Sequence, residues 1–121
     1  MYGDRAKQLI AELPNRGRLD NPTCHARAGN PVCGDEVELF LEIENGIIRR
    51  FRYLVSGCGG SMAGVAVLSL MVLDQPAEDA LNMTTNRLYE YLGGVPEAKR
   101  HGLELALDAL RLALATYELK S

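Results

Sequence analysis

Two neighbouring segments in the first half of the chain alternate apolar and charged residues, which is the pattern of a half-buried β-strand. Every second residue from 37 to 43 is valine, leucine or isoleucine, and glutamates occupy three of the remaining positions from 36 to 42. Asn45-Gly46 follows and favours a tight turn. The returning segment, 47–55, places arginines opposite these glutamates. We therefore predict an antiparallel β-hairpin.

Most of the remaining chain has apolar residues at helical spacing. We predict helices over 6–13, 62–73, 77–81 and 85–92, and a long last helix that begins at Pro96. The segment 62–73 is apolar on nearly every side, which places it in the core, and Ser61 is its expected N-cap. Residues 15–31 are rich in Asn, Arg, Gly and Pro and predict a loop that includes Cys24.

This order of elements predicts the α+β fold class, with a small antiparallel β-sheet packed on one face by several α-helices. The chain has 121 residues, of which 47% are hydrophobic, enough for one modest core. We therefore expect a single domain over residues 1–121. The helix over 62–73 and the apolar side of the last helix would cover the hairpin. No third strand is evident from the sequence.

Charge and hydropathy argue against two classes of partner. The net charge of −3 comes from 13 basic and 16 acidic residues spread along the chain, so we expect no surface for nucleic acid. The longest apolar run, 62–73, is too short to span a membrane. The first residues lack the pattern of an export signal. We expect a cytoplasmic protein that has no membrane partner.

The three cysteines, Cys24, Cys33 and Cys58, are an odd number for a disulfide framework and favour metal or thiol chemistry. Small buried cysteines are the alternative. Glycines flank Cys33 and Cys58, however, and a core cysteine needs no unusual backbone beside it. Cys33 precedes the first hairpin strand and Cys58 follows the second, so antiparallel pairing brings both thiols to one end of the sheet. Asp35 would point to the same side as Cys33.

The sequence favours a binding protein over an enzyme. His25 and His101 are the only histidines, and no motif pairs either with a cysteine nucleophile. The glycines at 57, 59 and 60 lack the lysine and the spacing of a phosphate-binding loop. Thiolate, carboxylate and imidazole are groups that hold iron or zinc. We expect a metal site and no catalytic residue.

Three segments resemble, in order, the sequence signatures of the NifU/IscU-type scaffold proteins on which iron-sulfur clusters are assembled. They are Asn30–Asp35 (NPVCGD), Gly57–Ser61 (GCGGS) and Val95–His101 (VPEAKRH). Residues 14–19 (PNRGRL) are similar to the family's Asn- and Arg-containing segment after its first helix. The resemblance covers nearly the whole chain. It implies the fold of the NifU N-terminal domain, a bound [2Fe-2S] cluster or Zn²⁺ ion, sulfur supply by a cysteine desulfurase, and delivery of clusters to apo iron-sulfur acceptor proteins.

The same resemblance implies a site made of Cys33, Asp35, Cys58 and His101. The family's third cysteine, which follows the histidine, falls on Gly102 and is therefore absent. That cysteine is the one most closely tied to accepting persulfide sulfur, so this activity does not follow for the chain. Only Pro96 and Lys99 match the segment that some members present to a dedicated Hsp70 chaperone. We do not predict that partner.

Cys24 offers a second way to complete the site. It lies nine positions before Cys33 in the predicted loop. A loop of that length can reach the cluster end of the sheet, where its thiol would replace the one missing at Gly102. An ordinary loop cysteine without a ligand role is the alternative, and the sequence does not decide between them.

Two functions stay open at the level of sequence. The first is an iron-sulfur scaffold or cluster carrier with atypical ligation, in which His101, Asp35 or Cys24 joins the two family cysteines. The second is a zinc-binding or metal-free relative that acts by protein interaction, for example with a cysteine desulfurase. Two thiolates, a carboxylate and an imidazole form a complete tetrahedral set for zinc. Whether the protein forms a homodimer around a bridging cluster is also open.

Overall fold

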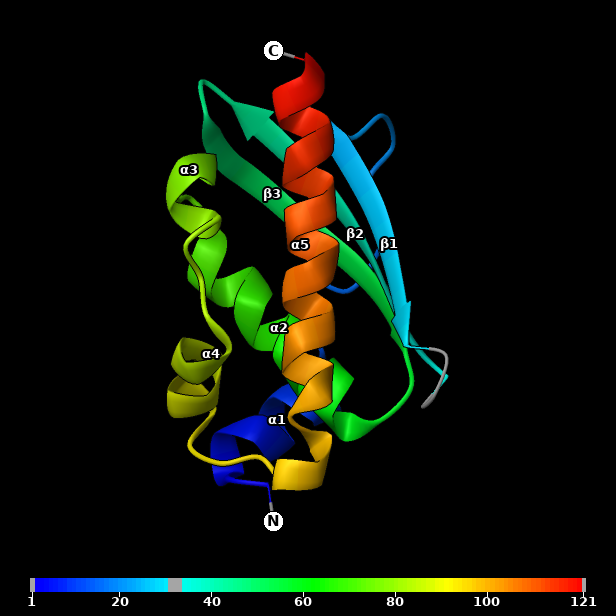
Figure 1. The fold of residues 1–121 in the computed structure, drawn as a ribbon, viewed down its shortest axis with the longest axis vertical. Coiled ribbons are helices and arrows are strands. Elements are labelled where there is room, and N and C mark those ends of the chain that lie inside the picture. The colour runs from blue at the N-terminus through cyan, green and yellow to red at the C-terminus, as the bar shows by residue number, and fades with distance from the viewer. Residues whose placement is uncertain (1, 31–33, 121) are drawn as a thin grey trace.

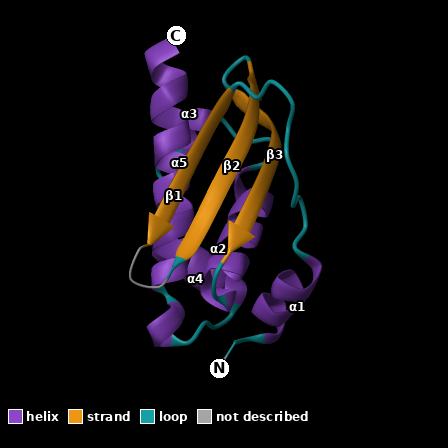
Figure 2. Ribbon diagram, turned by 90° about the vertical axis from the view of Figure 1, so that its right-hand side faces the viewer, coloured by secondary structure: helices purple, strands orange, loops and turns teal. Residues whose placement is uncertain are grey.

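The computed structural model describes residues 2–30 and 34–120, which form a three-stranded antiparallel sheet with helices on one face (Figure 1). In chain order the elements are α1 (Asp4–Glu12), β1 (Cys24–Asn30), β2 (Asp35–Glu44), β3 (Ile47–Ser56), α2 (Gly59–Val72), α3 (Ala77–Ala80), α4 (Thr85–Leu92), the 3₁₀ turn η1 (Glu97–Lys99) and α5 (His101–Lys120). Figure 2 shows the sheet as one layer and the helices as the other. The predicted α+β class is confirmed.

The β2–β3 hairpin has the predicted turn. Asn45 and Gly46 have φ angles of 53° and 79°, as a tight turn between twisted strands requires. On the outer face of the sheet, Arg50 donates a hydrogen bond of 3.3 Å to Glu42. The pairing continues to the far end of the hairpin, where Glu36 lies opposite Ser56. The residues just before β2 and just after β3 therefore meet at one end of the sheet.

The predicted loop over residues 15–31 is wrong in its second half, because residues 24–30 form β1 and pair with β2. Cys24 and Ala28 are buried in the core, whereas the exposed His25 and Arg27 point outward. The alternation of inward and outward residues that is typical of a strand is thus present in the sequence. Its inward side chains are small, however, so the pattern carries little hydrophobic signal.

Two helices, α2 and α5, cover the inner face of the sheet (Figure 1). All but one of residues 60–69 in α2 are buried, as their apolar pattern predicts. The α5 side chains Leu103, Leu107, Leu110 and Leu114 are at most 1% exposed and pack in the same core. The helices predicted over 6–13, 77–81 and 85–92 are confirmed, with small shifts at their ends. Within the described ranges, every helix is too short or too polar to cross a membrane.

Candidate metal centre

Three candidate ligand atoms converge where the first turns of α2 and α5 meet the start of β2. Asp35 is the first residue of β2, Cys58 is the N-cap of α2, and His101 is the first residue of α5. A carboxylate oxygen, the thiol sulfur and a ring nitrogen from these residues all lie within 4.8 Å of one another. The structure therefore brings together three of the sequence-predicted ligands from distant parts of the chain.

The separations between these atoms are close to those of ligands around one ion. Asp35 Oδ2 lies 3.2 Å from Cys58 Sγ and 3.3 Å from His101 Nε2, and Cys58 Sγ lies 3.9 Å from His101 Nε2. Ligand atoms bound at about 2.0–2.3 Å to a tetrahedral metal ion are separated by about 3.3–3.8 Å. The three side chains are thus placed close to the geometry that a shared ion requires.

Asp35 is almost fully buried, with 3% of its surface exposed, and is held by a network of donors. The backbone amide of Cys58 donates to Oδ1 at 3.1 Å, and the Ser61 hydroxyl donates to Oδ2 at 2.8 Å. Burial alone would raise the pKa of this carboxyl, but the hydrogen bonds that it accepts, chiefly those from Ser61 and Cys58, outweigh burial and hold the pKa below its usual value. The network therefore favours the ionised carboxylate, which is the metal-binding form.

The ring of His101 is oriented by the backbone of η1. Its Nδ1 lies 3.1 Å from the Ala98 carbonyl oxygen, and because a carbonyl can only accept, Nδ1 carries the proton. In the neutral ring the lone pair is then on Nε2, the atom that faces Asp35 and Cys58. A backbone carbonyl on one ring nitrogen and a free lone pair on the other is the usual arrangement of a metal-bound histidine.

These observations fit a metal ion or cluster. The Nε2 lone pair and the ionised carboxylate oxygen are only 3.3 Å apart, and two electron-rich atoms at that distance need a proton or a cation between them. Sulfur, nitrogen and oxygen donors together suit iron or zinc. The imidazole is 27% exposed and Cys58 is half-buried, so the site is accessible from solvent.

The sequence predicts two further ligands, Cys33 and Cys24. Cys33 lies outside the described residues, so its role stays a prediction. Cys24 is 2% exposed and lies opposite Leu41 in the sheet. The end of β1 that is near the site is the other one, where Asn30 lies opposite Asp35. Six residues of extended strand span roughly 20 Å. The loop predicted to carry Cys24 to the site is a strand, and Cys24 is a core residue at the strand's other end.

Sequence patterns missed the role of Ser61. The N-cap prediction is wrong, because α2 begins at Gly59 and Cys58 is its N-cap. Ser61 is fully buried and donates to Asp35 instead. The signal in the sequence, a serine just ahead of an apolar helix, fits both roles. Only the tertiary contact with Asp35 separates them.

Tyr2 is a second neighbour of the site that sequence patterns did not indicate. Its hydroxyl packs on Gly59, where a Cβ would lie 2.7 Å from the phenolic oxygen. Burial raises the pKa of the Tyr2 hydroxyl, and the nearby Cys58 and Asp35 raise it further. The hydrogen bond with the backbone of Gly60 lowers this pKa. A tyrosine 56 positions before Cys58 gives no sequence signal for this proximity.

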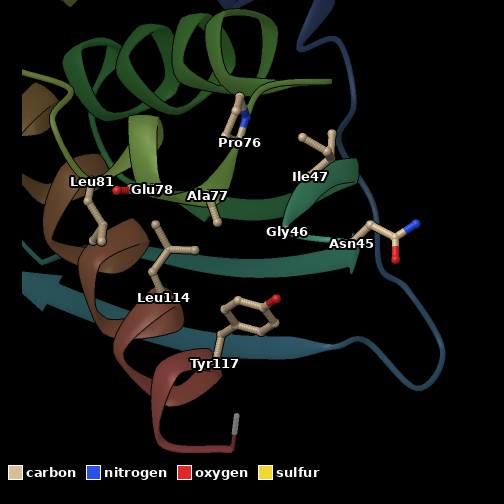
Figure 3. Close-up of a pocket in the computed structure, with 9 residues that line it drawn as sticks. All are labelled: Asn45, Gly46, Ile47, Pro76, Ala77, Glu78, Leu81, Leu114 and Tyr117. Carbon is tan, nitrogen blue, oxygen red and sulfur yellow. The ribbon is translucent and has the colours of Figure 1, made fainter.

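A groove of about 500 Å³ lies at the other end of the sheet, between the β2–β3 turn, α3 and the last turns of α5 (Figure 3). Its lining is mostly apolar and includes Leu81, Leu114 and Tyr117, with Glu78 at its edge. Neither cysteine nor histidine is among the described residues that line it. The candidate metal centre is therefore separate from this groove.

Comparison with known proteins places this chain in a family. The family model described as the NifU-like N terminal domain matches residues 1–121. The chain belongs to this family. This NifU-like domain is 35% identical over 121 residues to the iron-sulfur cluster assembly scaffold protein IscU of Aquifex aeolicus, with 98% of this chain and 77% of the relative covered. The family resemblance stated from the sequence is confirmed.

Other relatives agree with this family membership. The NifU-like domain is 31% identical over 117 residues to the iron-sulfur cluster assembly scaffold protein IscU 1 of Archaeoglobus fulgidus, with 97% of this chain and 76% of the relative covered. Among solved structures, the N-terminal part of a NifU-like protein from Brucella abortus is similar, with a TM-score of 0.80 at 20% identity, covering 98% of this chain and 95% of that one. At that identity the likeness supports the fold alone.

Proposed function

We propose that this NifU-like domain is an iron-sulfur cluster assembly scaffold or cluster carrier with atypical ligation. The observation that carries the proposal is the convergence of Asp35, Cys58 and His101 in a chain whose relatives are named as such scaffolds. Cys33, which precedes Asp35 by two residues, is proposed as the fourth ligand on the basis of the sequence. The cargo is a [2Fe-2S] cluster or iron, and we expect this to take place in the cytoplasm.

The chemistry of the site suits a cargo that must be released. Thiolates hold iron strongly, and replacing some of them by oxygen and nitrogen donors weakens the hold on a cluster. Asp35 supplies oxygen and His101 supplies nitrogen, which leaves Cys58 as the only thiol among the described ligands. Transfer is then a ligand exchange in which the thiolates of the recipient replace these side chains, without a catalytic residue.

The proposed partners follow from the family. A cysteine desulfurase would supply sulfur, and apo iron-sulfur proteins would receive the cluster. Gly102 has no thiol, so sulfur cannot be accepted at that position and must reach the site as sulfide or through another cysteine. An Hsp70 chaperone is not proposed, since only two positions of its binding segment match.

A zinc-binding relative that acts by protein interaction is the second candidate. The observation that favours it is the spacing of the ligand atoms, 3.2 Å to 3.9 Å, which is close to the spacing of ligands around one tetrahedral ion. Zinc would then fix the N-termini of α2 and α5 relative to β2, and the surface around the site would bind the partner, for example the desulfurase.

Cluster transfer tests the scaffold proposal. After anaerobic incubation with iron and sulfide, we expect the protein to show a visible charge-transfer spectrum and to pass its cluster to an apo-ferredoxin, measured by the absorption that the ferredoxin gains. The Cys58→Ala protein, treated identically, controls for assembly from free iron and sulfide. A wild-type protein that remains colourless, or that transfers no faster than Cys58→Ala, would contradict the proposal.

A further inference from the structure

We infer that Gly102 is a positioning residue whose missing side chain lets α5 lie against α2 and so brings His101 to Cys58 and Asp35. This inference rests on the proposed metal site, but it concerns the contact between the helices and not the identity of the metal. In the sequence, Gly102 is the position of a lost ligand. In the structure, it is a packing position that has no room for a ligand.

The backbone of Gly102 touches the backbone of α2. A Cβ on residue 102 would lie 2.8 Å from the Ser61 Cα and still closer to the Ser61 amide nitrogen and the Gly60 carbonyl carbon. Ordinary contacts of a Cβ begin at about 3.4 Å. The obstructing atoms belong to the backbone of a helix and cannot rotate away as a side chain could. Any residue other than glycine at 102 therefore requires the two helices to separate.

The contact involves glycines on both sides. A Cβ on Gly60 would collide with the Lys99 carbonyl oxygen, and a Cβ on Gly64, one turn later in α2, would lie 3.1 Å from the Gly102 carbonyl oxygen. A positive φ is not found at Gly60, Gly64 or Gly102. Glycine is therefore required at these positions for the close approach of two backbones and not for a turn.

This contact joins the two segments that carry the site. Cys58 and Ser61 belong to the first turn of α2, and His101 is the residue before Gly102. Metal ligands must be held within about 0.5 Å of their productive positions. A separation of the helices large enough to admit a Cβ would exceed that tolerance and move Nε2 of His101 away from Asp35 and Cys58. A cysteine introduced at 102 would therefore weaken the site before it could add a ligand.

Zinc affinity of glycine variants tests this inference, measured by competition with a chromophoric chelator. Gly102→Ala and Gly102→Cys are expected to bind Zn²⁺ about 10- to 100-fold more weakly than the wild type, as happens when the support of a metal ligand is removed. Gly29→Ala is the matched control, because its Cβ would make an ordinary contact of 3.6 Å with the Asp35 backbone. Its affinity is expected to stay within about two-fold of the wild type. Wild-type affinity in Gly102→Ala, or tighter binding in Gly102→Cys, would overturn the inference.

A milder variant and a metal-free measurement cover the case in which residue 102 variants do not fold. Gly64→Ala places its Cβ 3.0–3.1 Å from α5 atoms, which calls for a smaller shift, and it is expected to fold and to bind Zn²⁺ several-fold more weakly. In the metal-free wild type, we expect a nuclear Overhauser effect between the His101 ring and the Cys58 β-protons. It should weaken in Gly64→Ala and persist in Gly29→Ala. An unchanged effect in Gly64→Ala contradicts the positioning role even if the wild type binds no metal, which separates this failure from that of the proposed function.

Discussion

Replacing Asp35 by alanine is expected to lower the free energy of unfolding by about 2–4 kcal/mol and to abolish metal binding. The carboxylate accepts from the buried Ser61 hydroxyl and from the Cys58 amide, and alanine leaves both donors without this acceptor. Each unsatisfied buried group costs about 1–3 kcal/mol. The Asp35→Ala substitution also removes one of the converging ligand atoms. Urea unfolding and a Zn²⁺ titration measure the two effects.

Two substitutions make the Asp35 experiment specific. Glu36→Ala changes the neighbouring exposed carboxylate, and its unfolding free energy is expected to stay within about 0.5 kcal/mol of the wild type. Asp35→Asn keeps only one oxygen, which can accept from Ser61 or from the Cys58 amide but not from both, because these donors bind different oxygens of Asp35. It also removes the charge, so it should recover part of the stability while metal binding stays weak. If Asp35→Ala is as stable as Glu36→Ala, the hydrogen-bond network described here does not stabilise the fold.

Gly57→Ala is expected to have a comparably large effect, a loss of about 3 kcal/mol or more in unfolding free energy, for two separate reasons. Gly57 has a φ of 133°, a conformation that L-residues rarely adopt. A Cβ there would also collide with the Asp35 carboxylate and lie 2.9 Å from the Asp35 Cα. Relief of the collision would turn the carboxylate away from Cys58, so metal affinity should fall together with stability.

Gly93→Ala isolates the first of these reasons, the backbone strain. Gly93 has a φ of 74°, so alanine is strained there too, but a Cβ at this position meets no atom within 4 Å. Its cost should be about 1 kcal/mol, as for a single strained backbone conformation, and its metal affinity should equal that of the wild type. Equal losses of stability in Gly57→Ala and Gly93→Ala would show that the contact between Gly57 and Asp35 is unimportant.

Regular periodicity made the hairpin and the helices predictable from the sequence. The alternation in β2 and the Asn45-Gly46 turn define the register, and the register places Asp35 and Cys58 at the same end of the sheet. The apolar run of α2 likewise indicates a buried helix. These features depend on residues close together in the chain, which is why sequence patterns carry them.

The features that could not be predicted depend on tertiary contacts. β1 has small inward residues, so its period is weak, and Cys24 lies in the core as a consequence. Ser61 has the chemistry of an N-cap but donates to a carboxylate 26 positions earlier. For Gly102, the sequence indicates only that a thiol is absent. The packing reason depends on the backbone of Gly60 and Ser61, which no pattern around residue 102 contains.

We propose that Asp35, Cys58 and His101 hold a metal or cluster while Cys24 does not. This proposal is tested most directly by counting iron, acid-labile sulfide and zinc per chain after anaerobic reconstitution and gel filtration. Wild type and Cys24→Ala are predicted to retain iron and sulfide, and Cys58→Ala is predicted to lose both. Retention of zinc without sulfide would favour the second candidate function. Loss of metal in Cys24→Ala, or retention of iron and sulfide in Cys58→Ala, would contradict the account.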